Sequence, residues 1–344
     1  MKKLLSTLCT TALLFSAVVG CSSSQDTSNA NPQQGGASGS KSESDYKPEP
    51  SNIILASGPI GGGWYASAAA ISEVLMREIP GLNVTVTEGG GVANIKDVSS
   101  GAAQIGYTFS DTFNDAVNGN GDFNGSAADN ISGLSTLYQS FYQVIALEDN
   151  SKFQTLGDLK NGANILPGKK TFSGQVFTSN LLEKYYGTTY QQIEENGGKI
   201  SLTGYSEMTD LLKDGHADVA MAMTDAPSSF IMELNAMKKV RFLEVDPETA
   251  KKVEESNPGY VAAQLPANTY DGQTEPVNTI GSYTVMMLSN DIPAELAERI
   301  AKAIVENKDE LAQSQPSLSF VDKSTLKDGF KGAPVHPGVE AYLQ

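Results

Sequence analysis

Apolar and polar positions recur with two different periods along the chain from residue 52 onward. Residues 52–57 and 82–87 are short β-forming runs, and the second alternates apolar with polar side chains as a half-buried strand does. Residues 64–79 instead carry Ile71, Val74, Leu75 and Ile79 at helical spacing, and Pro80-Gly81 ends the run. Strand and helix patterns continue to alternate, which predicts an α/β fold with mostly parallel strands.

Two distant segments repeat the same order of elements. Residues 98–111 run from a helix end through Gly101 and a short apolar strand to Ser110-Asp111, and residues 212–225 do so through Gly215 to Thr224-Asp225. A strand and a glycine-containing loop precede each copy, at residues 52–63 and 163–175. The repetition predicts two α/β lobes built on one plan; the alternative is a chance similarity between ordinary strand–helix units.

The first twenty residues have the pattern of a secretory signal peptide. Lys2 and Lys3 precede an apolar run at residues 4–19, which is too short and too rich in hydroxyl residues for a transmembrane span of about 20 apolar residues. Small or apolar residues then precede Cys21, as in a bacterial lipobox. We expect Cys21 to be lipidated and to become the first mature residue; ordinary cleavage near Gly20 is the alternative.

Residues 21–50 combine this cysteine with a polar segment that has almost nothing to bury. Such a segment does not offset the entropy of ordering, so we expect a disordered tether between a lipid anchor and a folded body. Cys9 and Cys21 are the two cysteines of the chain, so a mature protein that begins at Cys21 would contain one cysteine and no intramolecular disulfide.

Composition excludes several classes of function. The formal charge of −16 argues against nucleic acid as a partner and is typical of a soluble, monomeric surface protein. The two histidines, His216 and His336, lie 120 positions apart and no cysteine cluster exists, which argues against a zinc site. We find no Walker loop, clean GxGxxG or Gly-x-Ser-x-Gly elbow, and we expect no enzyme activity, metal or cofactor.

Ligands of open α/β sheets bind beyond the carboxyl ends of strands, where helix N-termini point. Four loops of this chain have such positions, and their free backbone N–H groups suit a carboxylate or another anion. The candidate ligand-binding residues in these loops are Gly62, Gly63, Trp64, Tyr65, Ser110, Asp111, Thr171, Ser173, Gly174, Gln175, Thr224 and Asp225.

Each candidate also has a structural alternative. Ser110, Asp111, Thr224 and Asp225 are ordinary helix N-caps by propensity, and Trp64 and Tyr65 could be core aromatics. A hydrolase that uses Asp111 and Asp225 across a cleft, and a purely adhesive lipoprotein, are the function classes outside ligand transport.

Seven segments in order give the chain a family resemblance. They are residues 61–65, 87–94, 103–106 with Ser110-Asp111, 156–160, 211–215, 266–270 and 334–342. Together they resemble the TAXI family, the solute receptors of tripartite ATP-independent periplasmic (TRAP) transporters. The resemblance covers the chain from about residue 52 to its end, and it adds Gly91 and Asn94 to the candidate ligand-binding residues.

The resemblance implies a two-lobed type II periplasmic-binding-protein fold with the ligand cleft between the lobes. Lobe 1 would comprise residues 51–143 and 284–344, and lobe 2 the inserted residues 144–283. It further implies closure over a small-molecule solute, delivery to integral-membrane TRAP subunits by a lipid-anchored protein on the extracytoplasmic face, and uptake driven by an ion gradient. A receptor for an ABC importer or a sensor system is the alternative within the same fold.

The family suggests a glutamate-like amino acid or a dicarboxylate as the solute. This chain departs from the family at residues 64–66, Trp-Tyr-Ala instead of a tyrosine pair and proline, and at residues 171–175, Thr-Phe-Ser-Gly-Gln instead of Gly-Ser-Gly-Thr-Glu. Both changes bear on the choice of solute. Lys169 and Lys170 could neutralise a carboxylate; solvation in an exposed loop is the alternative.

Overall fold

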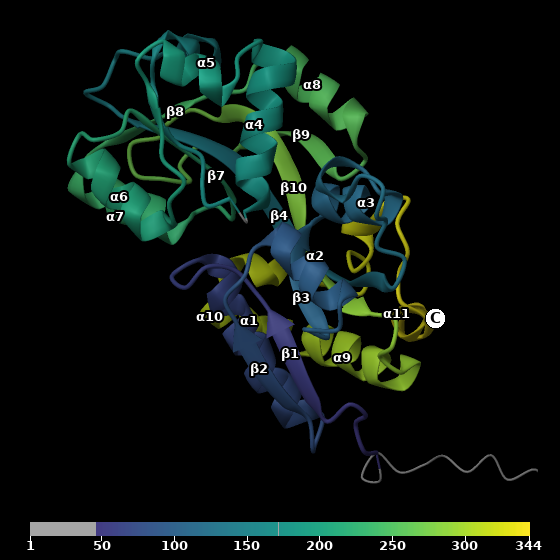
Figure 1. The fold of residues 1–344 in the computed structure, drawn as a ribbon. Coiled ribbons are helices and arrows are strands. Elements are labelled where there is room, and N and C mark those ends of the chain that lie inside the picture. The colour runs from purple at the N-terminus through teal and green to yellow at the C-terminus, as the bar shows by residue number, and fades with distance from the viewer. Residues whose placement is uncertain (1–45, 171) are drawn as a thin grey trace, which may run out of the picture. The chain divides into compact units, whose positions relative to one another are not determined.

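Two long strands, β4 (Ile131–Leu147) and β10 (Val277–Ser289), run antiparallel through the middle of a ten-stranded sheet (Figure 1). The computed structural model describes residues 46–170 and 172–344, and residues 46–344 form one compact unit. The expected signal peptide, the lipidation site Cys21 and residues 21–45 of the expected tether lie outside the described residues.

The sheet has the same arrangement on either side of this central pair. On one side, β10 pairs with β3, which continues through β1 to β2; on the other, β4 pairs with β7, which continues through β5 to β6. The pairings within each outer set are parallel. Every pairing of β4 or β10 with another strand is antiparallel, whereas an isolated bridge from Gly133 to Val335 is parallel. The expectation of mostly parallel strands is therefore right only within the outer sets.

Each outer set of strands carries its own helices. The elements of the first lobe outside the central pair are β1 (Asn52–Ala56), α1 (Gly63–Glu78), β2 (Asn83–Thr87), α2 (Gly91–Ser99), β3 (Ile105–Phe109), α3 (Ser110–Asn118), η2 (Gly121–Phe123), α9 (Ala294–Glu306), α10 (Lys308–Ser314), η4 (Pro316–Phe320), η5 (Asp328–Phe330) and α11 (Pro337–Leu343). Those of the second are η3 (Leu156–Asn161), β5 (Asn164–Leu166), α4 (Ser173–Tyr186), α5 (Tyr190–Glu195), β6 (Lys199–Ile200), α6 (Tyr205–Lys213), β7 (Val219–Thr224), α7 (Ser229–Met237), β8 (Val240–Leu243), α8 (Pro247–Ser256) and β9 (Tyr260–Leu265).

The repeated sequence segments form equivalent parts of the two lobes. Gly101 and Gly215 both have positive φ values, 79° and 74°, where the chain leaves α2 and α6. The strands that follow, β3 and β7, are buried along their whole length, because helices cover both faces of the sheet there. Four hydrophobic clusters result, two around the first lobe's strands and two around the second's.

Local sequence accounts for the helix bounds. In α1, the buried Ala68, Ile71 and Leu75 recur at helical spacing and pack on β1 and β2, and the helix ends just before Pro80. Among the described residues, no helix is both long enough and apolar enough to cross a membrane.

The architecture is that of a type II periplasmic binding protein: two α/β lobes joined by strands that pass between them. The expected lobe limits, residues 143/144 and 283/284, fall within β4 and β10. These limits stay a prediction, because β4 and β10 pair with each other along residues that span both limits. Beyond that pair, β10 pairs with β3 of the first lobe and β9 of the second, whereas β4 pairs with β7 and β8 of the second.

A loop of the second lobe packs closely on the start of α3 in the first. The Asn257 side-chain amide donates to the Asp111 carbonyl (3.1 Å) and to Asp115 Oδ1 (2.9 Å), and the backbone N–H of Gly259 donates to Asn257 Oδ1 (2.8 Å). A Cβ on Gly259 would lie 2.2 Å from the Asp111 nitrogen, so this contact requires glycine.

We therefore expect Gly259→Ala to lower the free energy of unfolding by about 1–3 kcal/mol, the usual cost of forcing an extra carbon into a packed site. Gly157→Ala is the control: the nearest atom to its added Cβ is Thr155 Oγ1 at 3.7 Å. Its effect should stay within about 0.5 kcal/mol. Urea unfolding measures both variants, and equal losses would contradict the close contact.

Candidate functional site

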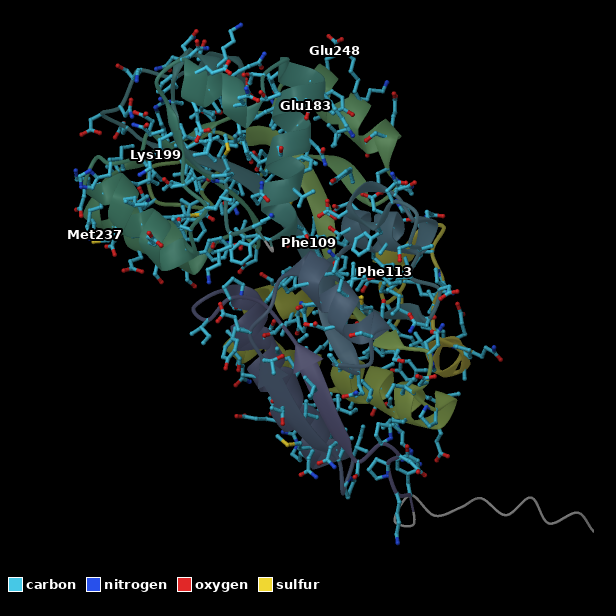
Figure 2. All side chains as sticks on the ribbon, viewed as in Figure 1. Phe109, Phe113, Glu183, Lys199, Met237 and Glu248 are labelled. Carbon is cyan, nitrogen blue, oxygen red and sulfur yellow. The ribbon has the colours of Figure 1, made fainter. Side chains whose placement is uncertain are left out.

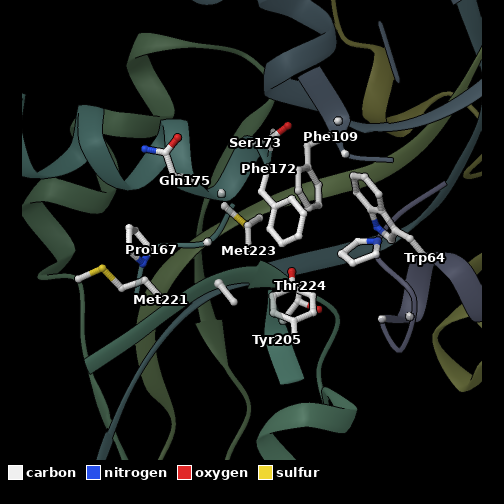
Figure 3. A pocket seen from close by; sticks show the side chains of 18 residues that line it. Trp64, Phe109, Pro167, Phe172, Ser173, Gln175, Tyr205, Met221, Met223 and Thr224 are labelled. Atoms are coloured by element: carbon white, nitrogen blue, oxygen red, sulfur yellow. The ribbon is translucent and has the colours of Figure 1, made fainter. Parts of the chain in front are cut away.

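A pocket opens between the lobes at the carboxyl ends of β3, β5 and β7 (Figure 3). It contains about 500 Å³ of space free of protein atoms, part of it open to solvent. Its residues come from both lobes: Pro59, Gly62, Gly63, Trp64, Gly90, Gly91 and Phe109 from the first, and Pro167, Gly168, Phe172, Ser173, Gly174, Gln175, Tyr205, Met221, Ala222, Met223 and Thr224 from the second.

Three helices have both their N-cap and their first residue in the pocket lining. These pairs are Gly62-Gly63 of α1, Gly90-Gly91 of α2 and Phe172-Ser173 of α4, and none of these N-termini has a side-chain cap. The first N–H groups of a helix have no intrahelical acceptor and carry the positive end of the helix dipole. The pocket therefore offers backbone donors suited to an anionic or hydrogen-bond-accepting group.

Aromatic side chains from both lobes form much of the wall (Figure 3). The Trp64 ring lies 4.6 Å from Phe109 between centroids, and its Nε1 donates to Thr284 Oγ1 of β10 at 3.0 Å. On the second lobe, Phe172 lies 5.6 Å from Tyr205, which stacks on Phe230 at 4.6 Å. An apolar part of a ligand would thus lie between two aromatic pairs.

Charged side chains lie elsewhere in the described part of the chain. No residue in the lining of this pocket is charged. Glu183, Lys199 and Glu248 stand on the outside of the second lobe, whereas Phe109 lies near the junction of the lobes (Figure 2). Lys169 and Lys170 are exposed, and Lys169 pairs with Glu88 of the first lobe at 3.3 Å. Neither lysine lines the pocket, so the structure favours the solvated alternative for them.

Eight of the residues expected from the sequence line the pocket: Gly62, Gly63, Trp64, Gly91, Ser173, Gly174, Gln175 and Thr224. Thr171 lies outside the described residues. Phe109 and Pro167 also line the pocket but were not among the expected residues, although both follow from the rule that ligands bind at the carboxyl ends of strands. Nothing in the sequence pointed to Tyr205, the first residue of α6.

Tyr65 and Asn94 do not line the pocket. Tyr65 is half-buried on α1. The fully buried Asn94 amide donates to the carbonyls of Ser57 (2.6 Å) and Tyr107 (2.8 Å) and accepts from the Gly90 N–H (3.1 Å). Asn94 therefore holds the loop before α2 against β1 and β3, and its part in the site is to position Gly90 and Gly91.

Asp225 lies behind the pocket and joins the lobes. Its carboxylate accepts from Thr224 Oγ1 (2.8 Å) and from Gln315 Nε2 of the first lobe (2.7 Å). It also lies so close to the start of α1 that a Cβ on Gly63 would be 2.9 Å from Oδ1. Burial raises the pKa of Asp225. The N-cap alternative is wrong for Thr224 and Asp225, because α7 begins at Ser229 with Ser228 as its N-cap.

Ser110 and Asp111 also lie away from the pocket, on the side of β10 where the Asn257 loop packs. The N-cap of α3 is Phe109, which has no side-chain oxygen, so the capping alternative is wrong for Ser110 and Asp111 as well. Burial raises the pKa of Asp111, whose side chain is 5% exposed. Neither aspartate lines the pocket, so the arrangement does not favour the hydrolase alternative.

Burial, together with the negative charge of Asp111, raises the pKa of Asp115 to about 6. The unfolded chain holds this proton with a pKa of ~3.9. Between these values the folded state binds more protons, so ionisation of Asp115 destabilises the fold progressively as pH rises through this range.

Asp115→Asn should therefore stabilise the protein at pH 7.5 and lose that advantage at pH 4, because asparagine keeps the acceptor for Asn257 without the charge. Urea midpoints at the two pH values measure the effect, and the exposed Asp149→Asn is the control. A gain of equal size at both pH values would show that charge is not its cause.

These features define a two-lobed α/β protein with a pocket between its lobes, lined largely by apolar side chains and by the starts of three helices. The chain belongs to the NMT1-like family, whose model matches residues 55–344.

Several solved structures are similar to this chain. The alkanesulfonate-binding protein SsuA from Xanthomonas axonopodis pv. citri, bound to MOPS, is 14% identical, with 87% of this chain and 84% of that chain covered and a TM-score of 0.45. A putative phosphate ABC transporter substrate-binding protein from Clostridium perfringens, with bound phosphate, is 13% identical, with 76% of this chain and 97% of that chain covered and a TM-score of 0.46. The amino acid ABC transporter substrate-binding protein AbpA from Streptococcus pneumoniae, bound to L-arginine, is 12% identical, with 82% of this chain and 96% of that chain covered and a TM-score of 0.43.

Proposed function

We propose that the protein is an extracytoplasmic, lipid-anchored receptor that binds a small carboxylate-type solute between its lobes and delivers it to a TRAP-type transporter. The observation that carries the proposal is the convergence of the uncapped starts of α1, α2 and α4 on one pocket with walls from both lobes. A solute there would bind both lobes at once and favour the closed arrangement by its differential affinity.

The proposal includes no catalysis. The residues that line the pocket offer backbone N–H groups, hydroxyls and an amide, but no side chain that is an effective general base at neutral pH. The bound solute should therefore be recovered unchanged. Extraction of the purified full-length chain with denaturant, followed by mass spectrometry, tests this: a released solute that stays intact on long incubation with fresh protein supports a receptor, and its conversion would indicate an enzyme.

We expect Gln175→Glu to weaken binding of this solute by about tenfold or more, because a second negative charge in a pocket of low dielectric repels the carboxylate. Glutamate near the start of α4 should not harm folding, since acidic residues stabilise helix N-termini. Gln313→Glu, at an exposed position of α10, is the control with the same change in net charge. Isothermal titration calorimetry measures both, and unchanged affinity in Gln175→Glu would place the solute elsewhere.

The transport partner requires a separate test. In proteoliposomes or cells, a TRAP-type partner predicts uptake that an ionophore abolishes and that ATP depletion leaves unchanged while the ion gradient is maintained. The reverse result would favour an ABC importer, and signalling without uptake would favour a sensor.

A further inference from the structure

One corner of the pocket is polar, whereas most of its wall is not. The corner lies where the start of α4, from the second lobe, meets the start of α2, from the first. A Cβ placed on Gly91 would lie 2.2 Å from Ser173 Oγ and 3.1 Å from Thr108 Oγ1. Glycine at position 91 therefore lets two hydroxyl groups approach the backbone where α2 begins.

Both hydroxyls are buried without a partner. Thr108 is fully buried and Ser173 is 5% exposed, and neither Oγ1 nor Oγ has a hydrogen-bonding partner. A buried polar group without a partner is unfavourable, and such groups in a native fold are expected to have one. Ser173 lines the pocket, whereas Thr108 does not. The N–H groups at the starts of α2 and α4, next to Ser173, are donors as well. This corner of the pocket therefore offers several hydrogen-bond donors and contains no carboxylate side chain.

The rest of the lining has few groups that could stabilise a second carboxylate of the solute. It consists of aromatic rings, the side chains of Met221, Ala222 and Met223, prolines and glycines, with Gln175, Thr224 and the Tyr205 hydroxyl as further polar groups. Thr224 Oγ1 is already engaged, since it donates to Asp225. The Lys169 ammonium lies 6.0 Å from the Phe172 ring centroid, but it does not line the pocket and it already pairs with Glu88. A second carboxylate against this wall would therefore have no cation in the lining, and burial of an unpaired charge is strongly unfavourable.

We propose that the solute is a monocarboxylate with an apolar body. Its carboxylate accepts hydrogen bonds from Ser173 Oγ and from the N–H groups at the starts of α2 and α4. Its body lies between the Trp64–Phe109 pair of the first lobe and the Phe172–Tyr205 pair of the second. The inference rests on the proposed function and narrows its ligand class, because it replaces the glutamate-like amino acid or dicarboxylate that the family resemblance suggests.

Isothermal titration calorimetry of the purified full-length chain tests the ligand class with six probes: phenylacetate and hexanoate, their amides phenylacetamide and hexanamide, and the polar acids succinate and L-glutamate. At least one monocarboxylate should bind about tenfold or more tightly than its own amide, as expected for hydrogen bonds to a charged acceptor, and than both polar acids. Trp64, the one tryptophan of the sequence, gives an independent fluorescence signal from within the pocket.

Variants test the corner itself. Ser173→Ala should lower the affinity for the monocarboxylate by about tenfold, which is the effect of losing one hydrogen bond to a charged group. The affinity for the corresponding amide should stay nearly unchanged. Ser151→Ala, at an exposed position of the same lobe, is the matched control and should change neither. Circular dichroism confirms that the variants fold. An equal loss for acid and amide would overturn the carboxylate position.

The other outcomes separate this inference from the proposed function. Tighter binding of succinate or glutamate than of either monocarboxylate would overturn the ligand class and support a receptor for polar acids. Equal affinity for acid and amide would overturn the anionic head group. If no probe binds but denaturation releases a solute of another class, the ligand class is wrong and the receptor stands. If no probe binds and nothing is released, both proposals fail.

Discussion

The pairing of β4 with β10 is the constraint on which the rest of the structure depends. The two strands pair from Gly281–Phe141 to Ser289–Ile131, and their outer edges hold β3 at residues 284–288 and β7 at residues 141–145. Since both parallel sets are attached to this one antiparallel pair, their carboxyl ends and the helices that follow them meet at one place. The pocket wall is tied to the pair directly, because Trp64 Nε1 donates to Thr284 Oγ1, which is hydrogen-bonded to Ser140 Oγ.

The pocket combines two kinds of surface that seldom suit the same ligand group. Backbone donors at the starts of helices favour negative charge, while the aromatic and methionine wall excludes water and strengthens each electrostatic interaction nearby. Glycine makes the combination possible, because the close approach of Ser173 to Gly91 leaves no room for a side chain between the lobes. Selectivity in such a site depends both on how many charges the solute carries and on where it carries them.

Much of the fold could be predicted from the sequence, whereas the chemistry of the site could be predicted only in part. Helical spacing and strand alternation are local, so α1, β2 and the paired elements around Gly101 and Gly215 were visible in the pattern. The roles of Asp111 and Asp225 were not, because both are set by distant partners, the Asn257 loop and Gln315. The NMT1-like family is established; the TAXI resemblance, the TRAP partner, the lipid anchor and the lobe limits stay predictions.

The position of β10 has a consequence for the order in which the protein folds when its chain emerges N-terminus first. The first lobe requires β10 between β3 and β4, yet β3 ends at residue 109 and β10 begins only at residue 277. The intervening chain contains the strands β5, β6 and β7 with their helices. These three strands pair with one another, so their pairings join segments that are closer in sequence than β3 and β10 are. Contacts between segments distant in sequence form late, because closing a long loop loses conformational entropy before the stabilising contacts have formed. The strands β1 to β3 therefore emerge first, but β3 gains its pairing with β10 late. Until nearly the whole chain has emerged, the unpaired edge of β3 is accessible to chaperones and prone to aggregation.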